Sequence, residues 1–210
     1  MNFYSQHGED ILLYYMLNGQ QEGFFVEVGC IDGKRFSNTY GFEEIGWKGL
    51  CVEAHSTYYK ILSERNCLSY HCAISDKNQE SIEFYANNRG TFSTLDQNKK
   101  ELFKKNNKNF TDFNLINVPC KTLNNVLNHF DIKDIDILSV DIEGNEYKAF
   151  LGLDLNIFNV KIIVSEIFNT QELRKIKEIL NTFGYRKVIR MKNNVFFVKD
   201  MSLVNNIKNK

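Results

Sequence analysis

The chain has a single proline, no excess of charge and no long apolar run. Lys plus Arg and Asp plus Glu both number 26, so zero net charge provides no general attraction to nucleic acid or anionic membrane. No apolar run approaches the ~20 residues that cross a bilayer. The start, MNFYSQHGED, lacks the basic and apolar regions of a signal peptide. These absences predict a soluble, cytoplasmic protein with no nucleic-acid partner and no membrane span.

Cysteine is present in an odd number and in no metal-binding pattern. The five residues are Cys30, Cys51, Cys67, Cys72 and Cys120, and no two form a C-x-x-C pair. Several lie in apolar, strand-like runs, which favours reduced, buried thiols over disulfides. No His/Cys spacing indicates zinc.

Apolar runs and helical patterns alternate along the chain. The runs expected as strands are 24–28, 49–54, 68–74, 81–87, a short one from 118, 135–144 and 160–167. The helices are expected at 10–18, 38–46, 56–66, 122–130, 145–152 and 170–184, before a hairpin of 185–191 and 194–200. This alternation predicts one α/β domain over residues 1–210, with a parallel sheet, helices on both faces and an antiparallel strand at one edge.

Helix ends carry recognisable polar or glycine signals. Ser37 or Asn38 is expected to cap the second helix, Ser56 the third and Thr122 the next. Gly184 is expected to close the last helix before the hairpin.

The stretch FFVEVGCIDG, residues 24–33, ends a buried run with an acid and two glycines. Gly29 and Gly33 allow positive φ and a close approach of the backbone. The stretch is not G-x-G-x-x-G, so it lacks the dinucleotide fingerprint. Glu27 would repel a pyrophosphate but suits a cationic or donor-rich ligand. The tight end of an ordinary buried strand is the competing interpretation.

Further acids end the following strands, where open α/β sheets bind their ligands. Glu53 ends the second strand, where a carboxylate can accept both hydroxyls of a ribose, although a solvated strand-end acid is the alternative. After the third strand, Ser75 or Asp76 could accept from an adenine amino group, or form a plain turn.

The stretch SVDIEGNEY, residues 139–147, places three carboxylates at one strand-to-helix turn. Asp141, Glu143 and Glu146 repel one another unless a cation or several donors lie nearby. The alternative is that Glu143 and Glu146 only favour the start of the next helix.

The order of these motifs resembles the FkbM family of S-adenosylmethionine-dependent methyltransferases. The residues that carry the resemblance are YSQHGED (4–10), FFVEVGCIDGKRFSNTYGFEEIGWKGLCVEA (24–54), CAISD, VPCKTLNNVL, IDILSVDIEGNEYKAFLG and IIVSEI. It extends from about residue 4 to 198. Cys30-Ile31 and Ala54-His55 depart from the family pattern, and His55 puts the local loop shape in doubt.

The resemblance implies a class I methyltransferase (Rossmann-like) fold, with a mostly parallel seven-stranded sheet, helices on both faces and an antiparallel C-terminal hairpin strand. It implies that the glycine turn holds the methionine portion of S-adenosylmethionine, that Glu27 and Asp141 flank the sulfonium, and that free amides at 37–39 bind a carboxylate or an anionic group. The predicted cofactor-binding residues are Gln6, Glu27, Gly29, Cys30, Gly33, Ser37, Asn38, Thr39, Glu53, Ala54, Ser75, Asp76 and Asp141.

The resemblance also implies methylation of a hydroxyl oxygen on a small molecule or a sugar or glycan precursor. Such a reaction requires a base, for which Asp141, Glu143, Glu146, Glu166 and His7 are candidates. Asp141 is favoured, with His7 closing over it. Asp141 with Glu166, or Glu143 with Glu146, could also bind a divalent metal, which stays open.

Two segments are predicted to cover the site: an N-terminal lid, 1–20, and a polar insert of about 87–112. The insert offers Arg89, Thr91, Ser93 and Thr94 to a substrate. Its run KKELFKKNNK is more typical of a solvated face, but it would otherwise favour a phosphorylated or nucleotide-linked sugar.

Other functions remain open on the sequence. The chain could be an inactive cofactor-binding scaffold, or, less favoured, a nicotinamide-dependent oxidoreductase or a nucleic-acid methyltransferase. The acceptor, the base, the metal and association into a homo-oligomer are undetermined.

Overall fold

Strands and helices alternate over most of the chain, with successive strands in the middle and at the C-terminal hairpin, as expected. The computed structural model describes residues 1–106 and 112–208. In chain order the elements are α1 (Glu9–Met16), β1 (Phe24–Val28), α2 (Tyr40–Glu44), β2 (Lys48–Glu53), α3 (Ser56–Ile61) with a 3₁₀ turn (Leu62–Glu64), β3 (Leu68–His71), β4 (Ala73–Ile74), β5 (Gln79–Asn87), α4 (Gln97–Asn106), β6 (Phe113–Lys121), α5 (Leu123–His129), β7 (Asp134–Val140), α6 (Glu146–Leu151), β8 (Asn159–Glu166), α7 (Thr170–Thr182), β9 (Arg186–Met191), β10 (Asn194–Val198) and α8 (Ser202–Lys208).

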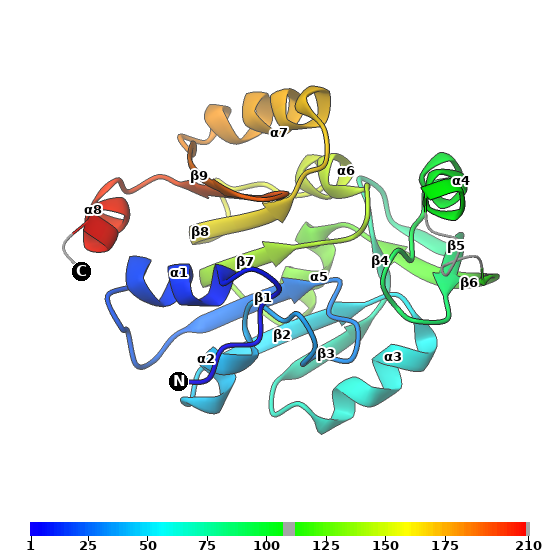
Figure 1. Ribbon diagram of the computed structural model, residues 1–210, viewed down its shortest axis with the longest axis horizontal. Coiled ribbons are helices and arrows are strands. Elements are labelled where there is room, and N and C mark those ends of the chain that lie inside the picture. The colour runs from blue at the N-terminus through cyan, green and yellow to red at the C-terminus, as the bar shows by residue number, and fades with distance from the viewer. Residues whose placement is uncertain (107–111, 209–210) are drawn as a thin grey trace.

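A seven-stranded sheet forms the centre of the molecule (Figure 1). Its order is β3-β2-β1-β7-β8-β10-β9, with parallel pairing from β3 to β8 and antiparallel pairing of β10 with β8 and β9. The predicted mostly parallel sheet with an antiparallel hairpin at one edge is confirmed. From β1 the chain adds β2 and β3 on one side of the sheet, and then β7 and β8 on the other side. A crevice is expected where the strand order reverses, at the carboxyl ends of β1 and β7.

Alternate residues of the central strands enter two separate cores, because successive side chains of a strand point to opposite faces. Val26 and Val28 join the core beneath α5, α6 and α7. Phe25 joins the core that packs α1, α2 and α8 against the other face. Both cores are fully apolar at their centres, so the sheet is covered on both sides, as parallel sheets require.

The run 68–74 is not one strand, which corrects the sequence-based prediction. β3 pairs with β2 in the main sheet, but β4 pairs with β6 in a second sheet of order β4-β6-β5. The chain leaves the main sheet at Cys72, and a small core around Phe84 and Val118 fills the space between the second sheet and the main body. Figure 1 shows this sheet, with α4, at the side opposite α8.

Two of the expected helix caps differ in detail. His55, not Ser56, precedes α3, and its Nδ1 accepts the backbone N–H of Thr57 at 3.3 Å. α2 begins after Thr39, whose side chain makes no cap bond; instead, Ser37 Oγ accepts the N–H of Tyr40 at 2.9 Å.

The other predicted ends agree with the structure. Thr122 Oγ1 accepts from Asn125 N at 3.1 Å, and Gly184 follows α7 with a φ of 85°.

The C-terminal helix α8 was not predicted. It packs on α1 through Leu203, Val204 and Ile207, and Asn206 Nδ2 donates to the backbone oxygen of Met16 at 2.7 Å. Within residues 1–106 and 112–208, every helix is too short or too polar to span a bilayer. All five cysteines are unpaired, and four are buried.

Candidate active site

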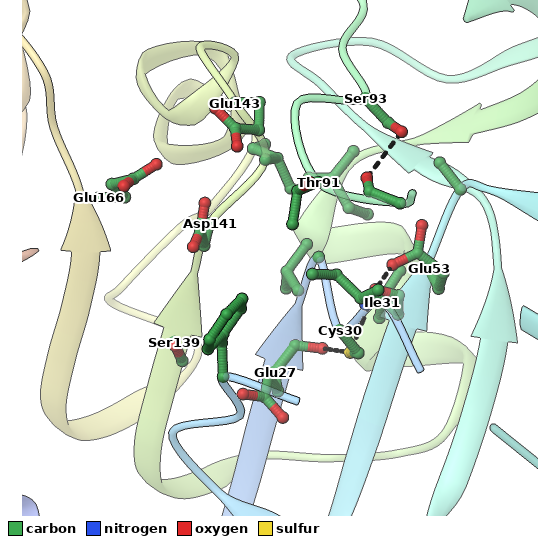
Figure 2. Close-up of a pocket in the computed structure, with 18 of the residues that line it drawn as sticks. Glu27, Cys30, Ile31, Glu53, Thr91, Ser93, Ser139, Asp141, Glu143 and Glu166 are labelled. Carbon is green, nitrogen blue, oxygen red and sulfur yellow. Dashed lines mark hydrogen bonds between the residues drawn. The ribbon is translucent and has the colours of Figure 1, made fainter. Parts of the chain in front are cut away.

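A cavity of about 270 Å³ opens at the carboxyl ends of β1, β2, β7 and β8. Most of the residues predicted for the site line it. They are Gln6, His7, Glu27, Gly29, Cys30, Ser37, Asn38, Glu53, Ala54, Asp141, Glu143 and Glu166. Figure 2 shows the acids arranged around this space, with Glu27 and Glu53 on one side and Asp141, Glu143 and Glu166 on the other.

The glycine turn brings the end of β1 against the end of β7. Gly29 has a φ of 85°, and a Cβ at this position would overlap the backbone oxygen of Asp141. Only glycine permits this approach. Cys30 lines the cavity, but its thiol donates to the backbone oxygen of Glu27 at 2.9 Å. Burial raises the pKa of Cys30 to about 11, so this thiol is neutral and holds the turn rather than offering a nucleophile.

Glu27 is almost fully occupied by contacts within the protein. Its carboxylate accepts Ser37 Oγ and Thr39 Oγ1, each at 2.7 Å, and the N–H of Asn38 at 2.8 Å. The guanidinium of Arg65 lies 3.7 Å away and is itself buried. The amides at 37–39 were expected to be free for a ligand. Two of them already donate hydrogen bonds within the protein, Asn38 N to Glu27 and Thr39 N to Ser37 Oγ. Glu27 fastens this segment to β1.

Glu53 keeps more of its accepting capacity. Its two oxygens each accept one backbone N–H, from Ile31 at 2.8 Å and from His55 at 2.7 Å. Each carboxylate oxygen can accept a second bond. Burial raises the pKa of Glu53 to about 7, although the backbone donors act in the opposite direction. A diol that donates to both oxygens would fit this carboxylate.

The ends of β7 and β8 bring three carboxylates together. Asp141, Glu143 and Glu166 each have an oxygen within 4.8 Å of the others. Burial is the main cause that raises the pKa of Asp141 to about 6 and of Glu143 to about 8. Burial and the neighbouring acids place the pKa of Glu166 far above its usual range.

Glu146, the remaining candidate base, does not line the cavity. Its Oε1 accepts the amides of Ile142 and Gly144 at 3.0 and 3.1 Å. This is the helix-starting role that the sequence allowed for it. Burial raises its pKa to about 7.

Four residues other than glycine adopt a positive φ on the cavity wall. They are Ile31 (51°), Phe36 (63°), Phe92 (64°) and Glu143 (56°). A left-handed conformation is costly for a β-branched residue such as Ile31, and such strain concentrates at functional sites. The strain therefore supports this cavity as the functional site, independently of its acids.

Four of the predicted cofactor-binding residues do not line the cavity. Gly33 packs against Leu62 and Arg65, and Thr39 is turned toward Glu27. Ser75 and Asp76 follow β4, which has left the main sheet, and Ser75 Oγ donates to Asp76 Oδ1 at 3.1 Å. The residues that line the cavity in this region are Cys72, Ala73 and Ile74 instead.

The N-terminal segment is held by hydrogen bonds and reaches the cavity. Asp10 accepts the amides of Tyr4 and Ser5 at 2.5 and 3.0 Å, and Ser5 pairs with Phe36 in an isolated bridge. This loop leaves Gln6 and His7 exposed on the cavity side.

The polar insert reaches the site through Glu143. The N–H of Phe92 donates to Glu143 Oε1 at 3.1 Å, and Thr94 Oγ1 donates to its backbone oxygen at 2.8 Å. Thr91 and Ser93 line the cavity as predicted candidates for substrate contact, whereas Thr94 is fully buried.

Two residues near the site, Arg65 and Lys99, were not identified as site residues from the sequence. Arg65 joins Glu27 to Glu43, at 2.7 Å from the latter, and donates to the backbone oxygen of Gly33. Lys99, in the basic run expected to be solvated, places its Nζ 4.4 Å from the centre of the Phe168 ring, with the amine enclosed. Neither residue has a sequence motif; their partners come from distant parts of the chain.

Comparison with solved structures finds proteins of similar length and low sequence identity. Precorrin-6y C5,15-methyltransferase from Geobacter metallireducens GS-15 is 13% identical, with 92% of this chain and 86% of that chain covered and a TM-score of 0.49. A putative RNA methyltransferase from Pyrococcus horikoshii is 12% identical, with coverage of 93% and 83% and a TM-score of 0.49. Precorrin 8w decarboxylase from Methanobacterium thermoautotrophicum is 12% identical, with coverage of 94% and 91% and a TM-score of 0.47.

No curated protein matches the sequence. The profile of the methyltransferase FkbM domain matches residues 27–187, which is most of the chain and includes the glycine turn and the acids at the ends of β2, β7 and β8. The chain therefore belongs to the FkbM family of S-adenosylmethionine-dependent methyltransferases.

Proposed function

We propose that the chain transfers the methyl group of S-adenosylmethionine to a hydroxyl oxygen of a small molecule or of a sugar or glycan precursor. The main support for this proposal is the position and the raised pKa of Asp141. This carboxylate lines the cavity at the end of β7, beside the glycine turn, and burial raises its pKa to about 6. A base whose pKa lies close to neutrality suits removal of a hydroxyl proton.

The cavity offers a matching set of groups for the cofactor. Glu53 would accept the ribose hydroxyls, and the turn at Gly29 and Cys30 would border the methionine portion. Ala54 and Ile74 supply apolar surface where the adenine would lie. The cofactor supplies an activated methyl group on a positively charged sulfur, and the acids of the far wall suit that charge.

The protein's own contribution is alignment and proton removal. Asp141 is held by the close contact of β1 with β7, in which its backbone N–H donates to Val28 O at 3.0 Å. Such fixed placement of a base beside two reactants is a main source of rate in group transfer. Glu143, Glu166 and His7 border the same space as further candidates for proton transfer.

We also propose that residues 1–210 form one domain, with 1–20 as a lid and about 87–112 as a substrate cap. His7 and Gln6 from the first segment and Thr91 and Ser93 from the second all line the cavity. Residues 107–111 of the cap lie outside the described residues.

The position of Arg35 favours an acceptor that carries an anionic group. Its side chain lines the cavity, is 41% exposed and donates to the backbone oxygen of Arg89 at 2.7 Å. This position suits the phosphate of a phosphorylated or nucleotide-linked sugar.

The test combines product analysis with one substitution. The protein is incubated with methyl-labelled S-adenosylmethionine and panels of sugars, sugar phosphates and nucleotide sugars, and the methylated atom is located by mass spectrometry and NMR. Asp141→Asn should lower turnover by ~10²–10⁴-fold, the usual contribution of a general base. Its affinity for S-adenosylhomocysteine should stay within a few-fold of the wild type.

The matched control is Glu80→Gln, because Glu80 is fully exposed on β5. Methylation on nitrogen or carbon, or normal turnover by Asp141→Asn, would contradict the proposal.

A further inference from the structure

Glu143 and Glu166 each have an enclosed carboxylate oxygen that accepts no hydrogen bond. This is Oε2 in both residues, as far as the described part of the chain shows. Glu166 also shares a side-chain hydrogen bond with Asp141, whereas Oε2 of Glu143 has no partner. An enclosed carboxylate oxygen without a partner is strongly unfavourable. Glu143 Oε1, by contrast, accepts the N–H of Phe92, which fixes the direction of the carboxylate. These oxygens point to a ligand rather than to a finished network of the fold.

The same two side chains converge with Asp141 on one point. One oxygen from each of the three carboxylates lies within 4.8 Å of the others, as Figure 2 also shows for their general arrangement. They come from the end of β7, the turn after it and the end of β8, all of which the paired strands hold in place. Three oxygens at this spacing can share one ion.

Acids outnumber cations in this region. Asp141, Glu143, Glu166 and the buried Glu146 come together with one enclosed amine, Lys99 Nζ, which forms no hydrogen bond within residues 1–106 and 112–208. A ligand that carries positive charge is therefore favoured here.

We propose that Asp141, Glu143 and Glu166 bind one hard divalent cation, Mg²⁺ or Mn²⁺, at the acceptor side of the cavity. Oxygen-only ligands select this class of metal over zinc or copper. Three carboxylates leave coordination positions for water or for an acceptor hydroxyl. The cation would orient that hydroxyl and lower its pKa. Asp141 would then act as a ligand, and His7, which lines the same cavity, would accept the hydroxyl proton. This catalytic part of the inference rests on the proposed O-methylation.

Manganese binding tests the site without requiring activity. The full chain is treated with EDTA, dialysed and titrated with MnCl₂, while the EPR signal of free Mn²⁺ is recorded. We expect one Mn²⁺ per chain, displaced by excess Mg²⁺. Glu143→Gln and Glu166→Gln should each weaken binding by at least ~10-fold, the lower end of what even outer-shell changes cost. Glu80→Gln should bind as the wild type does.

Two results would overturn the site. One is the absence of saturable Mn²⁺ binding by folded wild-type protein, and the other is unchanged binding in both folded variants. If a variant fails to fold, the unfolding temperature of the wild-type protein decides. Mn²⁺ should raise its unfolding temperature above the value in EDTA at equal ionic strength, and equal temperatures would refute the site.

The experiments distinguish failure of the metal site from failure of the proposed function. If the protein binds S-adenosylhomocysteine in EDTA but does not bind Mn²⁺, only the metal site is excluded. Stoichiometric Mn²⁺ binding, followed by a product that is not an O-methyl compound, leaves the site and removes the proposed reaction.

Discussion

The affinity for S-adenosylhomocysteine should fall as the pH is lowered through 7, because Glu53 must be ionised to accept two hydroxyls. Burial raises the pKa of this carboxyl to about 7 in the unliganded protein. Above that pH both oxygens accept, since each has a free position beside the N–H of Ile31 or His55. Below it, a proton occupies one oxygen and must leave before the ligand binds.

The size of the effect follows from the hydrogen bonds. Two hydroxyls that donate to a carboxylate stabilise the ionised form by ~1.5–3 kcal/mol. At 1.36 kcal/mol per pKa unit, the pKa of Glu53 in the complex should be lower by ~1–2 units. The affinity at pH 6 should then be ~5–10-fold weaker than at pH 8. Glu53→Gln should lose ~10–100-fold in affinity at pH 8, and most of this pH dependence.

Isothermal titration calorimetry at pH 6, 7 and 8 measures these values, and circular dichroism checks that Glu53→Gln is folded. Other acids of the cavity titrate in the same range, so the difference between wild type and variant is the decisive quantity. Equal pH dependence in both proteins would show that Glu53 does not contact the ribose. Equal affinity at pH 8 would remove its role in binding altogether.

Two further predictions concern stability, and a third concerns ligand binding. Glu27→Ala should destabilise the protein by ~3–5 kcal/mol and lower the unfolding temperature by ~6–20 °C, because three donors from Ser37, Asn38 and Thr39 lose their acceptor and Arg65 keeps only Glu43 as a carboxylate partner; a loss below 1 kcal/mol by calorimetry would refute this account of Glu27. Gly29→Ala should prevent folding or cost far more than Gly46→Ala, since both have positive φ but only Gly29 faces a backbone atom; similar urea midpoints would refute the steric argument. Cys30→Ser should keep S-adenosylhomocysteine affinity within ~3-fold, because the hydroxyl can still donate to the backbone as the thiol does; loss of binding with folding intact would instead show that sulfur touches the ligand.

The sequence predicted the main sheet and the acids around its crevice for one physical reason. Strands that are buried on both faces form nearly continuous apolar runs, and a polar residue within or just after the last positions of each run marks its carboxyl end. Parallel strands bring those ends to one edge. Glu27, Glu53, Asp141 and Glu166 therefore meet around one cavity, although they are far apart in the chain.

Features that depend on distant partners could not be predicted in this way. The run 68–74 contains no proline, glycine or turn signal, and nothing in it indicates that the chain changes sheets at Cys72. Arg65 ends a helical stretch and has no visible relation to Glu27. The helix α8 had a weak signal, with apolar residues at 203, 204 and 207, but it stands in a polar tail and becomes stable by packing on α1.

The acids at the strand ends looked equivalent in the sequence, yet their hydrogen bonds divide them by function. Glu27 accepts three donors and lies beside Arg65, so it has little capacity left for a ligand. Glu53 accepts two, and its remaining capacity matches a diol. Glu143 and Glu166 keep enclosed oxygens with no donor in the described residues. Because folding alone does not favour such oxygens, the side chains least satisfied by the protein are those on which a ligand should have the largest effect.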